Sequence, residues 1–398
     1  MSDRQVIVVG GGPTGMLLAL LLARRGVRVT VLERGSTFAR EFRGELLQPG
    51  ANQILAGLGL RERILALGYV FPPGLDIRDG RKTIRFELPH VFDARCGDGI
   101  MIVPQQQLLE MLAEEAARHA NFELVMGCSA RDLVCDADRV RGVRARRCGG
   151  ERLTIRAPLV IACDGRFSAM RRAAGIGVRE RPVRFDLVWF SAPNPGNLPN
   201  RIHLRTARDQ MFVAFASRTN RLQIGWFVHK GAYARLRARP FCEIVNHVAA
   251  HVPRPLERTV RESLTGWQDL ALFPAVSQVA DRWWQPGLLL LGDAAHPMSP
   301  SMGQGINVGM YDAVAAARHL VAAFATDAPL DEASSAIERL RSPAIAATQR
   351  TQNLLTGIMY AVGPDLALQL AIALIGFGTR TRWWPRCVRR EAHRLLWG

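Results

Sequence analysis

The chain has 398 residues, of which 48% are hydrophobic and 22% charged, a balance that excludes a disordered or fibrous protein. This length exceeds that of a typical single domain, so we expect two lobes that together bury a large core. The net charge of +17 would suit nucleic acid or an anionic membrane, but 50 of the 52 basic residues are arginines scattered along the chain. Without a nucleic-acid-binding motif, this pattern predicts no nucleic-acid partner and a surface that attracts anionic cofactors and substrates.

The cysteines indicate neither a disulfide framework nor a metal site, because no C-x-x-C pair and no histidine at ligand spacing accompanies them. The apolar start of the chain is interrupted by Gly10 to Pro13, and no basic segment precedes it, which argues against a signal peptide. We therefore expect a cytoplasmic protein with reduced thiols. The seven cysteines are Cys96, Cys128, Cys135, Cys148, Cys163, Cys242 and Cys387.

The first predicted elements form a strand–helix–strand unit. Val6 to Val9 is a short β-branched run bounded by glycines, and Met16 to Arg25 has a helical pattern. Val27, Val29 and Val31 then alternate as a second strand that ends at Glu33. Further along, the pattern predicts a helix at Leu108 to Ala120 and strands at Phe122 to Val125 and Arg141 to Ala145.

The pattern changes between residues 179 and 270, where short apolar runs separated by turns predict an antiparallel sheet at Leu187 to Phe190, Met211 to Phe215 and Leu222 to Val228. A buried strand at Leu288 to Leu291 and a helix at Gly305 to Ala323 then return the chain to the first lobe. We therefore expect an α/β fold. Its nucleotide-binding lobe spans residues 1–178 and 271–350, with an inserted sheet lobe at 179–270 and a helical tail at 351–398.

A G-x-G-x-x-G sequence lies between the first strand and its helix. Its glycines allow close approach of a pyrophosphate, the helix N-terminus attracts the negative charge, and Glu33 at the end of the second strand suits a ribose hydroxyl. A glycine-rich turn with an incidental surface glutamate is the alternative interpretation, and either FAD or NAD(P) fits the pattern. The candidate cofactor-binding residues here are Gly10, Gly12, Pro13, Thr14, Gly15, Glu33 and Arg34.

A second stretch, from Leu288 to Asn307, runs from the buried strand through a loop rich in proline and glycine into the long helix. It resembles the GD motif of the p-hydroxybenzoate hydroxylase family, the class A flavoprotein monooxygenases, although Met302 stands where a small residue is common. The resemblance implies FAD, a hydrogen bond from the flavin ribityl chain to Asp293, and a helix N-terminus beside the flavin ring. The candidate residues are Gly292, Asp293, Pro300, Gly303, Gly305, Ile306 and Asn307.

A third stretch, from Leu159 to Arg172, resembles the DG motif of the same family, which implies that Asp164 and Gly165 lie near the FAD and NAD(P)H pyrophosphates. A tight turn with Ser168 capping a helix is the other interpretation. Arg43 and Gln105 resemble the family's residues that contact the FAD pyrophosphate and ribose. The resemblance covers residues 4 to 350 and implies a Rossmann-like FAD-binding domain of the glutathione-reductase type with C-terminal helices.

The resemblance also implies the reaction: NADPH or NADH reduces non-covalently bound FAD, O₂ adds at flavin C4a, and the hydroperoxide hydroxylates an aromatic or other electron-rich small molecule. No catalytic side chain is assigned, and His296 is interpreted as a positioned loop residue. We expect the substrate between the sheet and the flavin loop, lined by Phe215, Gln223, Trp226 and Pro300, with core packing as the alternative for the two aromatic residues. Arg201, Arg205, Arg218 and Arg221 suit an acidic substrate or are simply solvated.

Three other functions stay open. A flavin-dependent halogenase would require a lysine and a W-x-W-x-I-P sequence, and neither Lys82 nor the segment from Trp283 to Gly287 matches. An FAD dehydrogenase or reductase would not use oxygen, and a flavin-bound interaction or regulatory protein would show only residual turnover. The basic, aromatic end of the chain favours packing or a dimer contact over a membrane surface, since Leu366 to Phe377 is too short to span a bilayer. We expect a monomer or homodimer.

Overall fold

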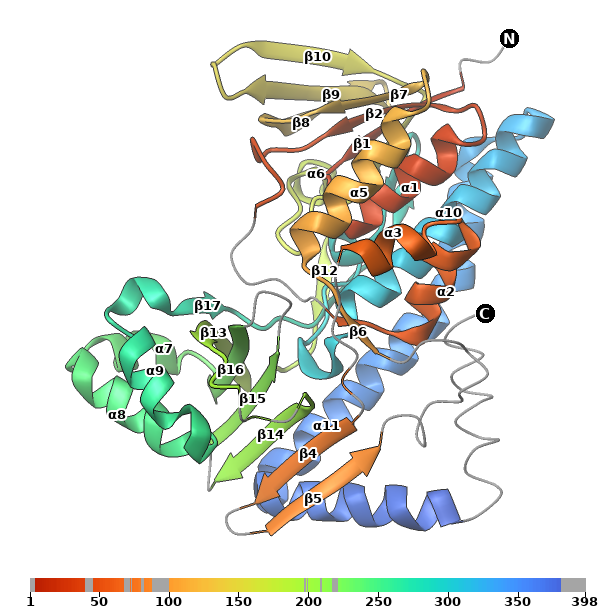
Figure 1. Cartoon of the computed structure of the whole chain (residues 1–398). Coiled ribbons are helices and arrows are strands. Elements are labelled where there is room, and N and C mark those ends of the chain that lie inside the picture. Colours follow the sequence, from red (N-terminus) through yellow and green to blue (C-terminus); the bar gives the residue numbers. More distant parts are fainter. Residues whose placement is uncertain are drawn as a thin grey trace.

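The computed structural model describes residues 4–39, 46–67, 72, 74–79, 82–87, 100–196, 198, 200–207, 210–216 and 221–380. The fold is α/β, with two large sheets that contain both parallel and antiparallel strand pairs (Figure 1). The helices are α1 (Pro13–Ala23), α2 (Pro49–Gly57), α3 (Arg61–Ala66), α5 (Gln105–Ala117), α6 (Ala169–Ala173), α7 (Ala232–Arg237), α8 (Phe241–His251), α9 (Glu257–Ser263), α10 (Gly305–Thr326) and α11 (Leu330–Arg380).

The first large sheet has six strands in the order β19-β20-β11-β1-β2-β7, and all neighbours except β19 and β20 run parallel. Strand β20, late in the sequence, pairs in parallel with β11. The strands are β1 (Gln5–Val9), β2 (Arg28–Leu32), β7 (Phe122–Val125), β11 (Leu159–Ala162), β19 (Trp284–Gln285) and β20 (Leu288–Leu290).

The central strands of this sheet are buried on both faces, as expected for a parallel sheet that is covered on both sides. Successive residues of β1 point into different cores. Val6 and Val8 pack with α1, α5 and α10, whereas Ile7 and Val9 pack with a second layer of three antiparallel strands. These strands are β8 (Cys128–Asp136), β9 (Arg139–Arg147) and β10 (Arg152–Arg156).

Two predicted helix boundaries are wrong. The first helix begins at Pro13 instead of Met16, and the helix predicted from Leu108 begins at Gln105. In both cases a proline lies at the start: Pro13 is the first residue of α1, and Pro104 is the N-cap of α5. A proline is well tolerated there because the first helical N–H groups have no partner within the helix.

The second large sheet has seven strands in the order β17-β13-β16-β15-β14-β4-β5. The antiparallel strands predicted from the three apolar runs are confirmed as β13, β15 and β16. No local pattern indicates that β4, from the first hundred residues, pairs in parallel with β14. The strands are β4 (Gly74–Asp79), β5 (Lys82–Glu87), β13 (Phe185–Pro193), β14 (Ile202–Ala207), β15 (Gln210–Ala216), β16 (Arg221–His229) and β17 (Ala271–Phe273).

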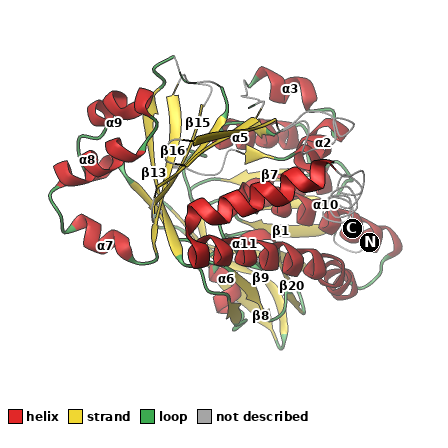
Figure 2. Ribbon diagram, turned by 90° about the horizontal axis from the view of Figure 1, so that it is seen from below, coloured by secondary structure: helices red, strands yellow, loops and turns green. Residues whose placement is uncertain are grey.

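The seven-stranded sheet has two different faces. Helices α7, α8 and α9 lie on one side, whereas α11 and the six-stranded sheet lie on the other (Figure 2). Even-numbered residues of β13, β15 and β16, such as Phe190, Phe212 and Trp226, pack into the core beneath α8 and α9. The odd-numbered residues therefore face the other lobe.

Short elements connect these layers. Two pairs of strands, β3 with β6 and β12 with β18, are antiparallel ladders, and four 3₁₀ turns lie in the fully described stretch between residues 254 and 303. They are β3 (Leu46–Leu47), β6 (Met101–Ile102), β12 (Val178–Glu180), β18 (Gln278–Ala280), η2 (Arg254–Leu256), η3 (Trp267–Asp269), η4 (Gly292–Ala294) and η5 (Ser301–Gly303).

Helix α11 is one continuous element, so the tail predicted from residue 351 begins inside it. None of the helices that the structure describes is long and apolar enough to cross a lipid bilayer.

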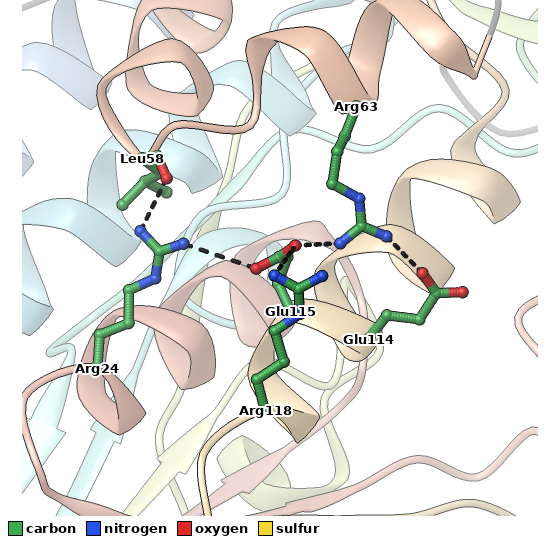
Figure 3. A network of polar contacts seen from close by, with 6 residues as sticks. All are labelled: Arg24, Leu58, Arg63, Glu114, Glu115 and Arg118. Atoms are coloured by element: carbon green, nitrogen blue, oxygen red, sulfur yellow. Dashed lines mark hydrogen bonds and ion pairs between the residues drawn. The ribbon is translucent and has the colours of Figure 1, made fainter.

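Helices α1, α3 and α5 are joined by a network of charged groups around Glu115 (Figure 3). The Glu115 carboxylate is only 5% exposed and pairs with Arg63, with Arg24 at 3.8 Å and with Arg118 at 3.4 Å. Arg63 also donates to Glu114, and Arg24 donates to the Leu58 carbonyl at 2.8 Å. The network therefore fixes the α2–α3 segment to the helical layer of the six-stranded sheet.

Candidate functional site

The three motif turns and Glu33 lie at one edge of the six-stranded sheet. The GD turn follows β20, the DG turn follows β11, the glycine-rich turn follows β1 and Glu33 follows β2. These four strands are consecutive and parallel, so their carboxyl ends meet at one edge, where parallel sheets bind their ligands. We call this the cofactor edge.

The glycine-rich turn contacts the other two turns directly. Gly10 has a φ of +107°, and a Cβ built there would lie 2.3 Å from the Cys163 carbonyl oxygen. Gly15 is equally restricted, since its Cβ would lie 2.0 Å from the Gly10 oxygen. Gly12 is the N-cap of α1, and no side chain caps this helix, so its N-terminus is suited to a phosphate.

Glu33 is 5% exposed and its position is fixed by the turns on either side of it. Its Oε2 accepts from the Gly11 N–H at 2.8 Å and its Oε1 accepts from the Gly35 N–H at 2.9 Å. A carboxylate oxygen accepts more than one hydrogen bond, so these contacts are compatible with a ribose hydroxyl as a further donor. Arg34, the next residue, is exposed.

The DG turn combines helix capping with a buried acceptor. Ser168 caps α6 by accepting from the Arg171 N–H at 2.9 Å, and Asp164 Oδ2 accepts from the N–H groups of Ala169 at 2.7 Å and Met170 at 3.1 Å. Asp164 Oδ1 is buried and has no hydrogen-bond partner within the described structure. Gly165 has a φ of +85°, which favours glycine. Burial raises the pKa of the neighbouring Cys163 thiol, which disfavours its thiolate form.

The GD turn packs against α1 through Thr14. A Cβ on Gly292 would lie 2.8 Å from Thr14 Oγ1, and one on Gly309 of α10 would lie 2.2 Å from the same atom. Gly292 also has a φ of +57°. Asp293 Oδ1 lies 3.9 Å from the Cβ position of Gly305, so its carboxylate is beside the first residue of α10. No side chain caps α10 either, and its positive end favours negative charge at this point.

The loop between the GD turn and α10 is held by Asn307, which is fully buried. Its Oδ1 accepts from the Gln48 N–H at 2.8 Å, and its Nδ2 donates to the carbonyls of Leu46 at 3.1 Å and Gly303 at 2.9 Å. Asn307 therefore joins β3 to the loop. The other loop candidates lie beside it: Pro300 begins η5, Gly303 has a φ of +59°, and Ile306 is partly buried in the first turn of α10.

Two buried charged residues fix the backbone on either side of Asp293. Asp312 of α10 accepts from the Gly292 N–H at 3.2 Å, and Arg171 of α6 donates to the Ala294 carbonyl at 2.8 Å. Asp312 also lies 2.6 Å from His296 Nε2 and accepts from Arg341 Nε at 2.8 Å. Burial alone would raise the pKa of Asp312, but His296 and Arg341 outweigh it and lower that pKa to about 2. His296 is 1% exposed in this network, a position that agrees with a structural role.

Gln105 is the first residue of α5 and is 8% exposed. Helix α5 leads into the parallel strand β7, so its N-terminus lies toward the cofactor edge. Arg43 lies outside the described residues.

The candidate substrate residues fall on both faces of the seven-stranded sheet. Phe215 and Gln223 are cross-strand partners on the face toward the other lobe, where Trp189 meets Phe215 edge to face at 5.9 Å. Trp226 lies on the opposite face, stacked on Phe212 and tilted against His247 of α8. Trp226 therefore packs in the core, which was the alternative interpretation of this residue.

The arginines proposed to catch an acidic substrate have other partners. Arg201 pairs with Asp76 at 2.5 Å, Arg205 donates to the Val252 carbonyl, and Arg221 donates to Ser191 Oγ at 2.8 Å. Arg218 lies outside the described residues. Within the described part of the chain, no three His, Cys, Asp or Glu side chains gather to hold a metal ion.

The residues at the cofactor edge fit FAD. They offer two uncapped helix N-termini, glycines at points of close approach, acids at the ends of β2 and β20, and the buried acceptor Asp164 Oδ1. Such an edge defines a dinucleotide-binding flavoprotein. The sequence family described as "FAD binding domain" (FAD_binding_3) matches residues 3–350, so the chain belongs to this family of FAD-dependent oxidoreductases.

Comparison with known proteins identifies the reaction class as monooxygenation. The chain is 37% identical over 324 residues to 6-methylpretetramide 4-monooxygenase of Streptomyces rimosus, which covers 79% of this chain and 74% of that protein. The alignments with other curated monooxygenases span 59% to 62% of their length. The chain is therefore an FAD-dependent monooxygenase.

Solved structures agree on the fold. Pseudomonas aeruginosa PqsL in complex with 2-aminobenzoylacetate matches with a TM-score of 0.77 and 23% identity over 91% of this chain and 97% of that one. The myxobacterial chondrochloren halogenase CndH matches with a TM-score of 0.73 and 22% identity over 84% and 78% of the two chains. Because monooxygenases and a halogenase share this fold, the fold alone does not distinguish their activities.

Asp312, Arg171 and Arg341, whose side chains reach the GD turn or its network, were not predicted from the sequence. A signal for Asp312 was present, because it is the only acidic residue in the largely apolar stretch from Gly305 to Thr326. Arg171 and Arg341 are two among 50 arginines and had no comparable signal.

Proposed function

We propose that this chain binds FAD non-covalently and uses NADPH or NADH and O₂ to hydroxylate an aromatic or other electron-rich small molecule. The observation that carries the proposal is the convergence of three motif turns, distant in sequence, at one sheet edge. FAD, when bound, accepts electrons from the nicotinamide nucleotide and activates O₂.

The protein's own residues would bind and orient the cofactor. Glu33 would accept from the adenosine ribose, the N-terminus of α1 would face the pyrophosphate, and Asp293 would accept from the ribityl chain. The N-terminus of α10 would favour negative charge on the flavin ring. The strand order supports the finer description of a Rossmann-like domain of the glutathione-reductase type, with the seven-stranded sheet largely inserted between β12 and β18.

We place the substrate against the face of the seven-stranded sheet that carries Trp189, Phe215 and Gln223. On β13, β15 and β16, the described residues of this face are apolar, apart from the cross-strand pair Ser191 and Gln223 and from Arg221 and His229 at the two ends of β16. A flat, uncharged aromatic molecule with hydroxyl or carbonyl groups suits such a surface better than a carboxylate does. Trp226 is not part of this proposal. The relative named for 6-methylpretetramide makes that compound the first to test.

The test is oxygen-dependent turnover. Acid precipitation should release FAD from the purified protein, and an aromatic substrate should accelerate NADPH or NADH oxidation. With ¹⁸O₂, one labelled atom should appear in the product. NAD(P)H oxidation that is equally fast without oxygen would indicate a reductase, and a product that is halogenated in the presence of chloride or bromide would indicate a halogenase. A protein that cannot be reconstituted with FAD would exclude all three activities.

A further inference from the structure

Helix α11 contacts the flavin loop, defined here as residues 292–304, at several points along its length. Gln352 Nε2 donates to the carbonyls of Ser299 at 3.1 Å and Ser301 at 2.8 Å. Gln349 Nε2 donates to the carbonyl of Pro297 at 3.3 Å and to that of Gln278 at 2.9 Å. Both glutamines are at most 1% exposed, so these carbonyls have little access to water as a replacement donor.

The same helix face reaches the GD turn. Arg341 donates to Asp312, which accepts from the Gly292 N–H. Arg341, Ile345, Gln349 and Gln352 follow one another at spacings of three or four residues, and all four are buried. One side of α11 therefore holds the loop near its start, middle and end.

We propose that α11 holds the flavin loop in one ordered conformation and that Gln352 is a positioning residue for the flavin. The proposal rests on the proposed function for the identity of the ligand, FAD. The ordering of the loop by α11 does not depend on that function. Gln352 lies beyond residue 350, where the match to the FAD-binding family ends. The other three residues of this face, Arg341, Ile345 and Gln349, lie within the match.

Substitution of the amide tests the proposal. Gln352→Met keeps the length of the side chain but removes both donors, so the Ser299 and Ser301 carbonyls lose their partner. Asn121→Leu is the matched control, because Asn121 Nδ2 also donates to two carbonyls, those of Ala23 at 3.0 Å and Val27 at 2.6 Å. These carbonyls flank the start of β2, at the sheet edge opposite the cofactor edge.

Three measurements are compared for wild type and both variants: hydrogen exchange of residues 292–308 in the apoprotein, the Kd for FAD, and the visible spectrum of bound FAD. In Gln352→Met we expect exchange to accelerate, the Kd to rise about tenfold, and the flavin band to shift. Asn121→Leu should lower the melting temperature while leaving all three unchanged. Gln352→Asn, whose side chain is one methylene shorter, should give an intermediate effect. This variant replaces Gln352→Met in the comparison if Gln352→Met does not fold.

Two results would overturn the proposal. One is a Gln352→Met protein that melts at a lower temperature but keeps the wild-type loop exchange, Kd and spectrum. The other is an equal loss of FAD affinity in both variants, which would indicate general destabilisation. If the wild-type protein failed to bind FAD, the proposed function would fail, and the exchange measurement on the apoprotein would still show whether α11 orders the loop.

Discussion

Three carboxylates follow strands at the cofactor edge, and each has different partners. Glu33 accepts from two backbone N–H groups, Asp164 caps α6 with one oxygen and keeps the other buried, and Asp293 lies beside the start of α10. All three carboxylates therefore interact with the protein itself. Asp293 is the one that we propose as the acceptor for the flavin ribityl chain, so its loss tests that contact.

Asp293→Ala should weaken FAD binding by roughly tenfold to a hundredfold, because a hydrogen bond to a charged acceptor contributes about 1.5 to 3 kcal/mol. Titration of the apoprotein with FAD, followed by flavin fluorescence, measures this change. Asp293→Asn keeps an acceptor and should fall between wild type and Ala. Unchanged FAD affinity in Asp293→Ala, with only a lower melting temperature, would show that the residue is a loop cap and not a ligand.

Asp312→Asn should reduce stability in a pH-dependent way. The folded-state pKa of Asp312 is about 2, below its ordinary value of 3.8, so its contribution is complete above pH 3.8 and is lost as the pH falls toward 2. At pH 7 the loss should be about 2 kcal/mol. Urea unfolding of wild type and variant between pH 7 and pH 3 measures it. A difference that stayed constant down to pH 3 would contradict this assignment.

At the scale of elements, local sequence patterns were sufficient to predict those turns whose backbone conformation requires particular residues. Gly10, Gly292 and Gly303 have positive φ values, so their positions in the sequence already indicated the turns. Contacts between distant segments were not predictable in this way. Nothing near Gln352 in sequence indicates that it donates to Ser299, and the alternation in β16 did not reveal that Trp226 faces α8 and not the other lobe.

Glu115→Gln should lower the free energy of unfolding by about 1.5 to 3 kcal/mol, because a buried carboxylate that pairs with three arginines loses its charge. Glu114→Gln is the neighbouring control: its side chain is 67% exposed and contacts only Arg63 in the network of Figure 3, so its loss should cost at most about 1 kcal/mol. Chemical unfolding of both variants gives the comparison. Equal losses would show that burial of Glu115 does not strengthen the network.

At the scale of the whole molecule, part of the arginine in the described residues is paired with acids or used inside the fold. Several exposed arginines pair with acids four residues further along the chain, as Arg239 does with Glu243 and Arg258 with Glu262. Others are buried and hold backbone carbonyls, as Arg171 does. The charge is therefore partly neutralised locally and partly used inside the fold.

Duplex DNA should consequently bind weakly and without sequence preference, since a dispersed positive charge contacts phosphates but offers no element that reads base edges. The Kd should lie near 10⁻⁴ to 10⁻⁶ M at physiological salt, on the order expected for non-specific binding. Fluorescence anisotropy with two unrelated duplexes at about 50 mM and 200 mM salt measures it. The two duplexes should bind alike, and affinity should fall steeply at the higher salt. Selective binding that resisted the higher salt would contradict this prediction.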